Sequence, residues 1–162
     1  MSKVYLICGK IASGKTYYAN KLKDKVGGVI LSTDEVTYDL IDNEQGEFYD
    51  QFALRVNKYL NKKAIEIVKA GTNVILDWGF WTSKNREEET KYLKNNDIEV
   101  EWHYIDINDD DWNININNRN ELIKEGKGGF DFYVNEGLKK KTSTLFEIPK
   151  KDEIDVWYKF ER

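Results

Sequence analysis

This sequence of 162 residues contains one cysteine, Cys8, one proline, Pro149, and one histidine, His103. A single cysteine cannot form a disulfide within the chain, and one cysteine with one histidine cannot supply the clustered ligands of a zinc site. Cys8 and His103 are therefore expected to be structural residues. The sequence also lacks an apolar run of about 18 residues or more and a charged-then-apolar leader. We therefore expect a cytoplasmic protein with no membrane partner.

Positive charge is in deficit, because 25 Lys and Arg stand against 29 Asp and Glu and give a formal net charge of -4. Proteins that bind the backbone of long nucleic acids do so with clustered Lys and Arg, so a long nucleic acid is not the expected partner. Hydrophobic residues make up 40% of the chain, which is enough for a core. A chain of this length fits one core, so we expect a single domain over residues 1–162. The oligomeric state is not indicated.

Short apolar runs alternate with segments of helical spacing along the chain. The expected strands are residues 3–8, 29–31, 73–79, 98–107 and 154–160. Helices are expected after Gly14, from about residue 48 to 70, from about 83, from 109 to 125, and after a loop between residues 125 and 149. Such alternation predicts βαβ units with right-handed crossovers and an essentially parallel sheet covered on both faces. The predicted fold class is therefore α/β.

The first expected strand ends on the motif GKIASGKT, in which two glycines bracket four residues and are followed by lysine and threonine. Glycines let the backbone turn tightly around phosphates, and the helix that follows offers its positive end. Lys15 is expected to reach the β- and γ-phosphates, and the Thr16 hydroxyl to ligate Mg²⁺. The expected nucleotide-binding residues are Gly9, Lys10, Ile11, Ala12, Ser13, Gly14, Lys15 and Thr16. The context favours a bound nucleoside triphosphate over a glycine-rich turn with a surface lysine, and leaves ATP and GTP both open.

Two other expected strands end on acids. Asp77 follows the apolar run VIL at the carboxyl edge of the sheet, where it is expected to hold Mg²⁺ or phosphate rather than to cap a helix or lie in a loop. Asp34 follows VILST and would emerge at the same edge of a parallel sheet. A carboxylate there could take the proton of an acceptor hydroxyl, or it could equally be the N-cap of the next helix.

The cluster WGFW over residues 78–81 places three large aromatic side chains beside Asp77. Trp78 and Trp81 are candidates to line an acceptor pocket, since aromatic faces bind planar or apolar groups. Ordinary core packing is the alternative for each ring. Tyr38, Phe48 and Tyr49 lie where an acceptor-binding segment would be expected, with the same alternative.

Taken together, GKIASGKT, LSTDEV, VILDWGFW, NREEE and NNRN resemble the P-loop kinase group that includes zeta toxin, chloramphenicol phosphotransferase and the 5′-kinase domain of phage polynucleotide kinase. They look most like the small ATP-binding proteins with an LDWGFW motif that are described generically as AAA-family ATPases. The resemblance runs from the first strand to Pro149. It implies a P-loop NTPase fold of nucleoside-kinase type, with three α/β/α layers, a five-stranded parallel sheet of order 2-3-1-4-5 and a lid at residues 120–145.

The resemblance also implies roles for individual residues. Asp34 would be the general base, and Arg119 would be the lid arginine that clamps the phosphates beside Lys15. Arg86 would contact the acceptor, with a surface residue that pairs with Glu89 or Thr90 as the alternative. Two positions depart from the pattern, because Asn115 and Thr37 replace arginines.

Two classes of function remain open from the sequence. The first is a kinase that uses ATP and Mg²⁺ to phosphorylate a hydroxyl of a small molecule or nucleotide. The second is a nucleotide-dependent ATPase or regulatory binding protein with no phosphoryl acceptor, favoured by the loss of arginines at Asn115 and Thr37. A polynucleotide 5′-hydroxyl kinase is a weaker alternative, because Thr37 replaces the arginine that would hold the acceptor's phosphate. The sequence does not identify the acceptor.

Overall fold

The computed structural model of the chain describes residues 1–41 and 47–162. Its strands are β1 Val4–Cys8, β2 Gly28–Leu31, β3 Asn73–Gly79, β4 Val100–Asp106 and β5 Val156–Lys159. Its α-helices are α1 Lys15–Val26, α2 Thr33–Ile41, α3 Glu47–Lys69, α4 Ser83–Asn95, α5 Asp109–Lys124 and α6 Glu136–Leu145, and a short 3-10 helix spans Lys151–Glu153. The strands form one sheet in the order β2-β3-β1-β4-β5, with every neighbouring pair parallel. The predicted fold class and strand order are confirmed.

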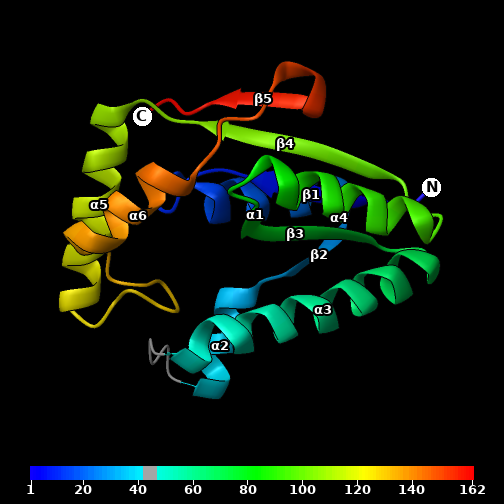
Figure 1. The fold of residues 1–162 in the computed structure, drawn as a ribbon, viewed down its shortest axis with the longest axis horizontal. Coiled ribbons are helices and arrows are strands. Elements are labelled where there is room, and N and C mark those ends of the chain that lie inside the picture. The colour runs from blue at the N-terminus through cyan, green and yellow to red at the C-terminus, as the bar shows by residue number, and fades with distance from the viewer. Residues whose placement is uncertain (42–46) are drawn as a thin grey trace.

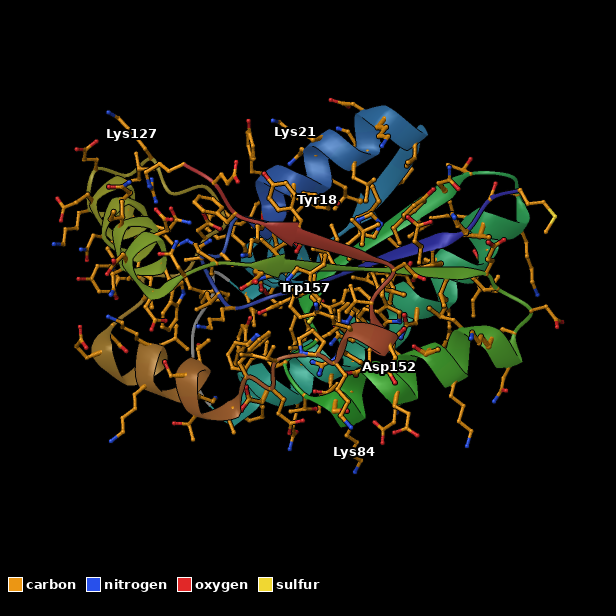
Figure 2. The ribbon with its side chains drawn as sticks, turned by 90° about the horizontal axis from the view of Figure 1, so that it is seen from above. Tyr18, Lys21, Lys84, Lys127, Asp152 and Trp157 are labelled. Carbon is orange, nitrogen blue, oxygen red and sulfur yellow. The ribbon has the colours of Figure 1, made fainter. Side chains whose placement is uncertain are left out.

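Helices cover both faces of this sheet (Figures 1 and 2). Helix α1, which carries Tyr18 and Lys21, lies on one side, and α4, which carries Lys84, lies on the other. The central strand β1 is buried along its whole length, so that its alternate side chains enter two different cores. Leu6 packs with Leu76 in the core toward α3 and α4, and Ile7 packs in the core toward α1. This two-sided burial explains why β1 is a continuous apolar run.

The long helix α3 is amphipathic. Its buried residues Val56, Leu60, Ala64 and Val68 recur every four residues and form one stripe against the sheet. The helix ends before Gly71, whose φ of +96° lies in the left-handed region that glycine adopts at helix ends. The predicted helix of residues 48–70 is therefore confirmed.

The segment after β4 packs around the carboxyl ends of the strands. Trp112 and Ile116 of α5 join Ala12 of the glycine loop, Ile107 and Val134 in a third apolar cluster. This cluster fixes α5 and the chain before α6 next to the glycine loop. Across the described residues, no helix is both long and apolar enough to cross a membrane.

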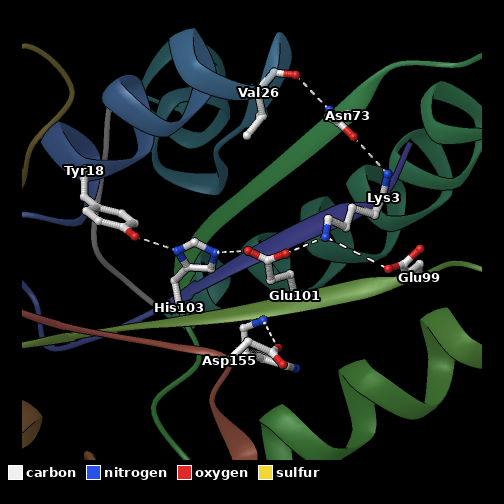
Figure 3. A network of polar contacts seen from close by, with 9 residues as sticks. Lys3, Tyr18, Val26, Asn73, Glu99, Glu101, His103 and Asp155 are labelled. Carbon is white, nitrogen blue, oxygen red and sulfur yellow. Dashed lines mark hydrogen bonds and ion pairs between the residues drawn. The ribbon is translucent and has the colours of Figure 1, made fainter. Parts of the chain in front are cut away.

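His103, the one histidine, lies in a polar network on the α1 face of the sheet (Figure 3). Its Nε2 lies 2.8 Å from Glu101 Oε1, and its Nδ1 lies 2.6 Å from the Tyr18 hydroxyl. Burial lowers the pKa of His103, and Glu101 partly opposes the shift, so the ring is neutral near pH 7. Because the Glu101 carboxylate only accepts hydrogen bonds, Nε2–H donates to it and the Tyr18 hydroxyl donates to Nδ1. The network fastens α1 to β4, in agreement with the expected structural role.

Tyr18→Phe is expected to lower the free energy of unfolding by about 1–2 kcal/mol, because the buried Nδ1 of His103 loses its hydrogen-bond donor. Tyr17→Phe on the same helix is the matched control, since Tyr17 is 65% exposed and lies outside the network. Urea denaturation of both variants measures the difference. Equal stabilities would show that the network does not stabilise the fold.

Candidate active site

The glycine motif forms a tightly curved loop between β1 and α1. Ala12 and Gly14 both have left-handed backbones, with φ values of +58° and +94°, and the Ser13 N–H donates to the Lys10 carbonyl at 3.2 Å. The Lys15 ammonium donates to the same carbonyl at 2.6 Å. Successive turns of this kind create concave arrays of N–H groups that bind anions. The loop therefore has the geometry that the motif predicted.

Two glycines of the loop are required by close contacts. A Cβ atom on Gly9 would lie 2.8 Å from Ser13 Oγ. A Cβ atom on Gly14 would lie 3.3 Å from the Phe160 ring, in a backbone conformation that other residues rarely adopt. A side chain at Gly9 would displace Ser13, and a side chain at Gly14 would press on the Phe160 ring and strain the backbone.

Asp77 lies at the floor of the site beside the loop. Its Oδ2 accepts a hydrogen bond from the Thr16 hydroxyl at 3.3 Å, and its side chain is 7% exposed. Its Oδ1 is buried and has no partner among the described residues. Burial raises the pKa of Asp77 to about 6, while the nearby Lys15 ammonium opposes the shift. A buried carboxylate oxygen without a partner, next to a threonine hydroxyl, fits the ligand set of Mg²⁺.

An irregularity in β3 explains why neighbouring residues face the same site. The β1–β3 register runs from Leu6 opposite Leu76 to Cys8 opposite Gly79, so β3 carries one extra residue there. A regular strand points successive side chains to opposite faces, whereas a bulge redirects one of them. Asp77 and Trp78 consequently both line the cavity.

The WGFW residues contact both the cavity and the core. Trp78 and Trp81 line the cavity and also pack against the core cluster that contains Phe80, so both expected roles apply to them. Phe80 is 4% exposed and packs edge to face on Trp102, with ring centroids 4.9 Å apart. Gly79 and Phe80 both have positive φ values, +85° and +48°, and the Trp78 and Phe80 rings remain in contact across this turn, with centroids 5.5 Å apart.

Asp34 lies in the first turn of α2 and lines the same cavity. Its alternative role as a helix cap is wrong, because the Ser32 hydroxyl accepts the hydrogen bond from the Glu35 N–H, at 3.3 Å. Burial raises the pKa of Asp34, and the charges of Lys15 and Arg119 oppose the rise. Because Ser32 caps the helix, the Asp34 carboxylate is available on the cavity wall.

The cavity has a volume of about 560 Å³. It lies at the carboxyl ends of β1, β2 and β3, between the glycine loop and α3, where open α/β sheets bind ligands. Its lining residues are Ile11, Ala12, Lys15, Thr16, Thr33, Asp34, Tyr49, Asp50, Ala53, Asn57, Asp77, Trp78, Gly79, Trp81, Arg119, Asp131, Phe132, Leu138 and Lys141.

Arg119 reaches the cavity from α5. Its Nη2 lies 3.5 Å from Asp131 Oδ1, and its side chain is 19% exposed. Asn115, one turn earlier, donates from Nδ2 to the Ala12 carbonyl at 2.9 Å and accepts from Arg162 Nη2 at 2.6 Å. Asn115 therefore supports the glycine loop, and the guanidinium of Arg162, three residues after β5, lies against it.

Thr37, the second position without the expected arginine, is buried in α2. Its hydroxyl donates to the Asp34 carbonyl at 3.0 Å, and its side chain also hydrogen-bonds to Tyr49. Thr37 carries no charge, so it cannot neutralise an acceptor phosphate.

The structure corrects the surface alternative for Arg86. Arg86 is 3% exposed and pairs with neither Glu89 nor Thr90. Its Nη1 donates to the Phe80 carbonyl at 2.9 Å, and its Nε donates to Glu153 Oε1 at 3.2 Å. Arg86 is not among the cavity-lining residues, so the described contacts give no support to its assignment to the acceptor. It holds the turn that places Trp78 and Trp81.

Tyr49, which the sequence placed in an expected acceptor-binding segment, lines the cavity, whereas several other cavity residues were not identified from the sequence. Ala53 and Asn57 lie on the same face of α3 as Tyr49, and their spacing of four residues beside the buried stripe was an available signal. Asp131 and Phe132 lie between α5 and α6, where no periodicity marks them. Tyr38 and Phe48, in contrast, are exposed and do not line the cavity.

Arg86→Met is expected to lower the free energy of unfolding by about 3 kcal/mol, because Glu153 and the Phe80 carbonyl lose their buried cation. Lys84→Met on the same helix is the control, since Lys84 is 82% exposed and its ion pair with Glu88 is worth little. Thermal or urea unfolding distinguishes the two. If both variants were equally stable, Arg86 would not hold the turn.

The fold agrees with comparisons to known structures. A putative kinase from Chloroflexus aurantiacus J-10-fl superposes with a TM-score of 0.72 at 17% identity, over 98% of this chain and 86% of that chain. The APS kinase CysC from Mycobacterium tuberculosis, solved with AMPPNP and APS, gives 0.69 at 16% identity, over 99% and 90%. A sugar kinase from Janibacter sp. HTCC2649 gives 0.68 at 14% identity, over 98% and 86%. At these identities the likeness shows the fold alone.

Sequence comparison supports a broader grouping. No curated protein matches the chain. The narrower resemblance to zeta toxin and chloramphenicol phosphotransferase stays a prediction. The model of the AAA domain family matches residues 4–126, which is most of the sequence. The chain therefore belongs to the AAA domain family.

Proposed function

We propose that this protein is an ATP-dependent kinase that transfers the γ-phosphate of ATP to a hydroxyl group of a small molecule. The observation that carries the proposal is the convergence of Lys15, Asp77, Asp34 and Arg119 on one cavity, with an aromatic wall beyond them. A site for nucleotide hydrolysis alone has no need of a second compartment lined by aromatic rings.

The glycine loop would hold the phosphates of ATP. Lys15 would leave the Lys10 carbonyl and bind the β- and γ-phosphates, and Arg119 would bind them from α5. Thr16 and Asp77 would hold Mg²⁺, which screens the charge that develops on the phosphates. Within residues 1–41 and 47–162, no cluster of three or more His, Cys, Asp or Glu side chains is placed to hold a metal ion unaided. The remaining ligands would come from the nucleotide and water, which is the usual arrangement for Mg²⁺.

Asp34 would act as the general base. Its carboxylate would accept the proton of the acceptor hydroxyl as the hydroxyl oxygen bonds to the γ-phosphorus and the bond to the β–γ bridging oxygen breaks. The products would be ADP and the phosphorylated acceptor. The raised pKa of Asp34 suits this role, because a carboxylate that holds a proton more strongly is the better base. Residues 120–145 would act as the lid, since Asp131, Phe132, Leu138 and Lys141 already border the cavity.

A second function, that of a nucleotide-dependent ATPase or regulatory protein, is favoured by one observation. Asn115 is engaged with the Ala12 carbonyl and Arg162, so α5 contributes Arg119 without a second arginine from position 115. Fewer cations beside the phosphates would give slower transfer. A polynucleotide 5′-hydroxyl kinase has less support, because the uncharged Thr37 offers nothing to an acceptor phosphate.

Lys15→Met is expected to weaken ATP binding about 100-fold, because one charged donor to the phosphates is lost. Lys21→Met is the control, since Lys21 lies on the same helix and does not line the cavity. Isothermal titration calorimetry with MgATP measures both. Unchanged affinity in Lys15→Met would contradict nucleotide binding at this loop.

Asp34→Asn is expected to lower phosphoryl transfer at least 100-fold while the affinity for ATP is preserved, because the amide cannot accept the hydroxyl proton. Glu35→Gln is the control, an exposed acid in the same helical turn. The assay incubates the protein with MgATP and a panel of nucleosides, nucleotides, sugars and hydroxylated antibiotics. Acceptor-independent hydrolysis of ATP that Asp34→Asn leaves unchanged would support the ATPase alternative.

A further inference from the structure

The compartment beyond the phosphate loop is walled by aromatic rings from three segments. Tyr49 comes from α3, Trp78 and Trp81 from the end of β3 and the turn after it, and Phe132 from the chain between α5 and α6. The rings of Tyr49 and Phe132 meet edge to face with centroids 5.5 Å apart. This contact closes one side of the cavity between α3 and the proposed lid.

Carboxylates accompany these rings. Asp34, Asp50 and Asp131 all line the cavity, in addition to Asp77 at its floor. Asp34 and Asp131 are close enough to interact, because the negative charge of Asp131 contributes to the raised pKa of Asp34. The acceptor compartment therefore gathers acids from α2, α3 and the segment before α6.

Fewer cations would remain to neutralise the carboxylates of the cavity once a nucleotide is bound. The described lining residues include Lys15, Arg119 and Lys141 as cations. In the proposed kinase, Lys15 and Arg119 bind the phosphates of ATP, and Arg119 would then no longer neutralise Asp131. Among the described lining residues, only Lys141 would then remain to offset the charges of Asp34, Asp50 and Asp131. The acceptor compartment would therefore be negatively charged.

We propose that the acceptor is a hydroxyl compound that carries a positively charged amino group, and this inference rests on the proposed kinase function. Aromatic faces attract ammonium groups through their negative face, and flanking carboxylates add a direct charge interaction. An acceptor that already carries a phosphate or carboxylate would be repelled by the same carboxylates. The amino group stays protonated throughout, and the transferred phosphoryl group bonds to the hydroxyl oxygen, whose proton passes to Asp34.

The experiment compares matched compounds that differ in charge. The pairs are glucosamine with N-acetylglucosamine, and kanamycin with its fully N-acetylated form; glucose 6-phosphate is the anionic member. For at least one pair, kcat/KM with MgATP is expected to be at least 10-fold higher for the amino compound, and glucose 6-phosphate is expected to be the poorest acceptor. The preference is expected to decrease as salt is added, because it is electrostatic.

Variants locate the preference in the cavity. The double variant Asp50→Asn/Asp131→Asn is expected to reduce the ratio of amino to neutral acceptor about 10-fold, and effects on ATP cancel within each ratio. Asp39→Asn is the control, since Asp39 is an exposed acid of α2 that does not line the cavity. A ratio near one in the wild-type protein, or a ratio that the double variant leaves unchanged, would overturn the inference and leave the kinase proposal standing.

The two proposals are also distinguished when no compound is phosphorylated. Binding of the same pairs is then measured by tryptophan fluorescence with Mg²⁺ and AMPPNP, because Trp78 and Trp81 line the compartment. Tighter binding of the amino compounds, lost in the double variant, would support the inferred ligand class while the kinase proposal fails. Equal binding of both members of each pair would overturn the inference.

Discussion

Lys15, Asp34 and Asp77 line one cavity at the carboxyl edge of the sheet, and the site depends on how their charges balance. Burial lowers the pKa of Lys15 and raises those of Asp34 and Asp77, because it disfavours the charged form of each group. Each lysine–carboxylate attraction opposes these shifts. The parallel pairing of β1 with β3 makes this balance possible, since it places the glycine loop and Asp77 side by side. A triphosphate with its cation would enter a site whose charges are already arranged around it.

The aromatic wall depends on a second buried charge. The bulge in β3 directs Asp77 and Trp78 into the same cavity, and the left-handed turn at Gly79 and Phe80 then returns the chain so that Trp81 also faces it. Arg86 donates a hydrogen bond to the Phe80 carbonyl and a second one to the Glu153 carboxylate. The main-chain bond from the Glu147 N–H to the Trp81 carbonyl, at 2.7 Å, joins the chain after α6 to the same turn. The position of the tryptophans is thus linked to the segment that follows the proposed lid.

The charged residues that line the cavity come from several segments. Lys15 follows the glycine loop, Arg119 lies on α5 and Lys141 lies on α6, whereas Asp50 lies on α3 and Asp131 lies 3.5 Å from Arg119. Thr37, where the resemblance implies an arginine, bonds to the Asp34 carbonyl and to Tyr49 and brings no positive charge to the neighbouring Asp34. In the proposed kinase, Lys15 and Arg119 would bind the polyphosphate, and Asp50 and Asp131 would face a positively charged acceptor.

The α/β class, most of the elements and the tightly curved glycine loop could be predicted from the sequence alone, because local periodicity and the GKIASGKT spacing report on the backbone directly. The strand order was inferred from resemblance and then confirmed by the sheet. Only the tertiary structure decided the roles of side chains whose partners are far away in the chain. Ser32 rather than Asp34 caps α2, and Arg86 is buried against Phe80 and Glu153. Trp78 lines the cavity while it also packs on the buried Phe80. Tyr49 meets Phe132 across 83 residues of sequence, a contact that no local pattern encodes because it exists only where α3 and the segment before α6 converge.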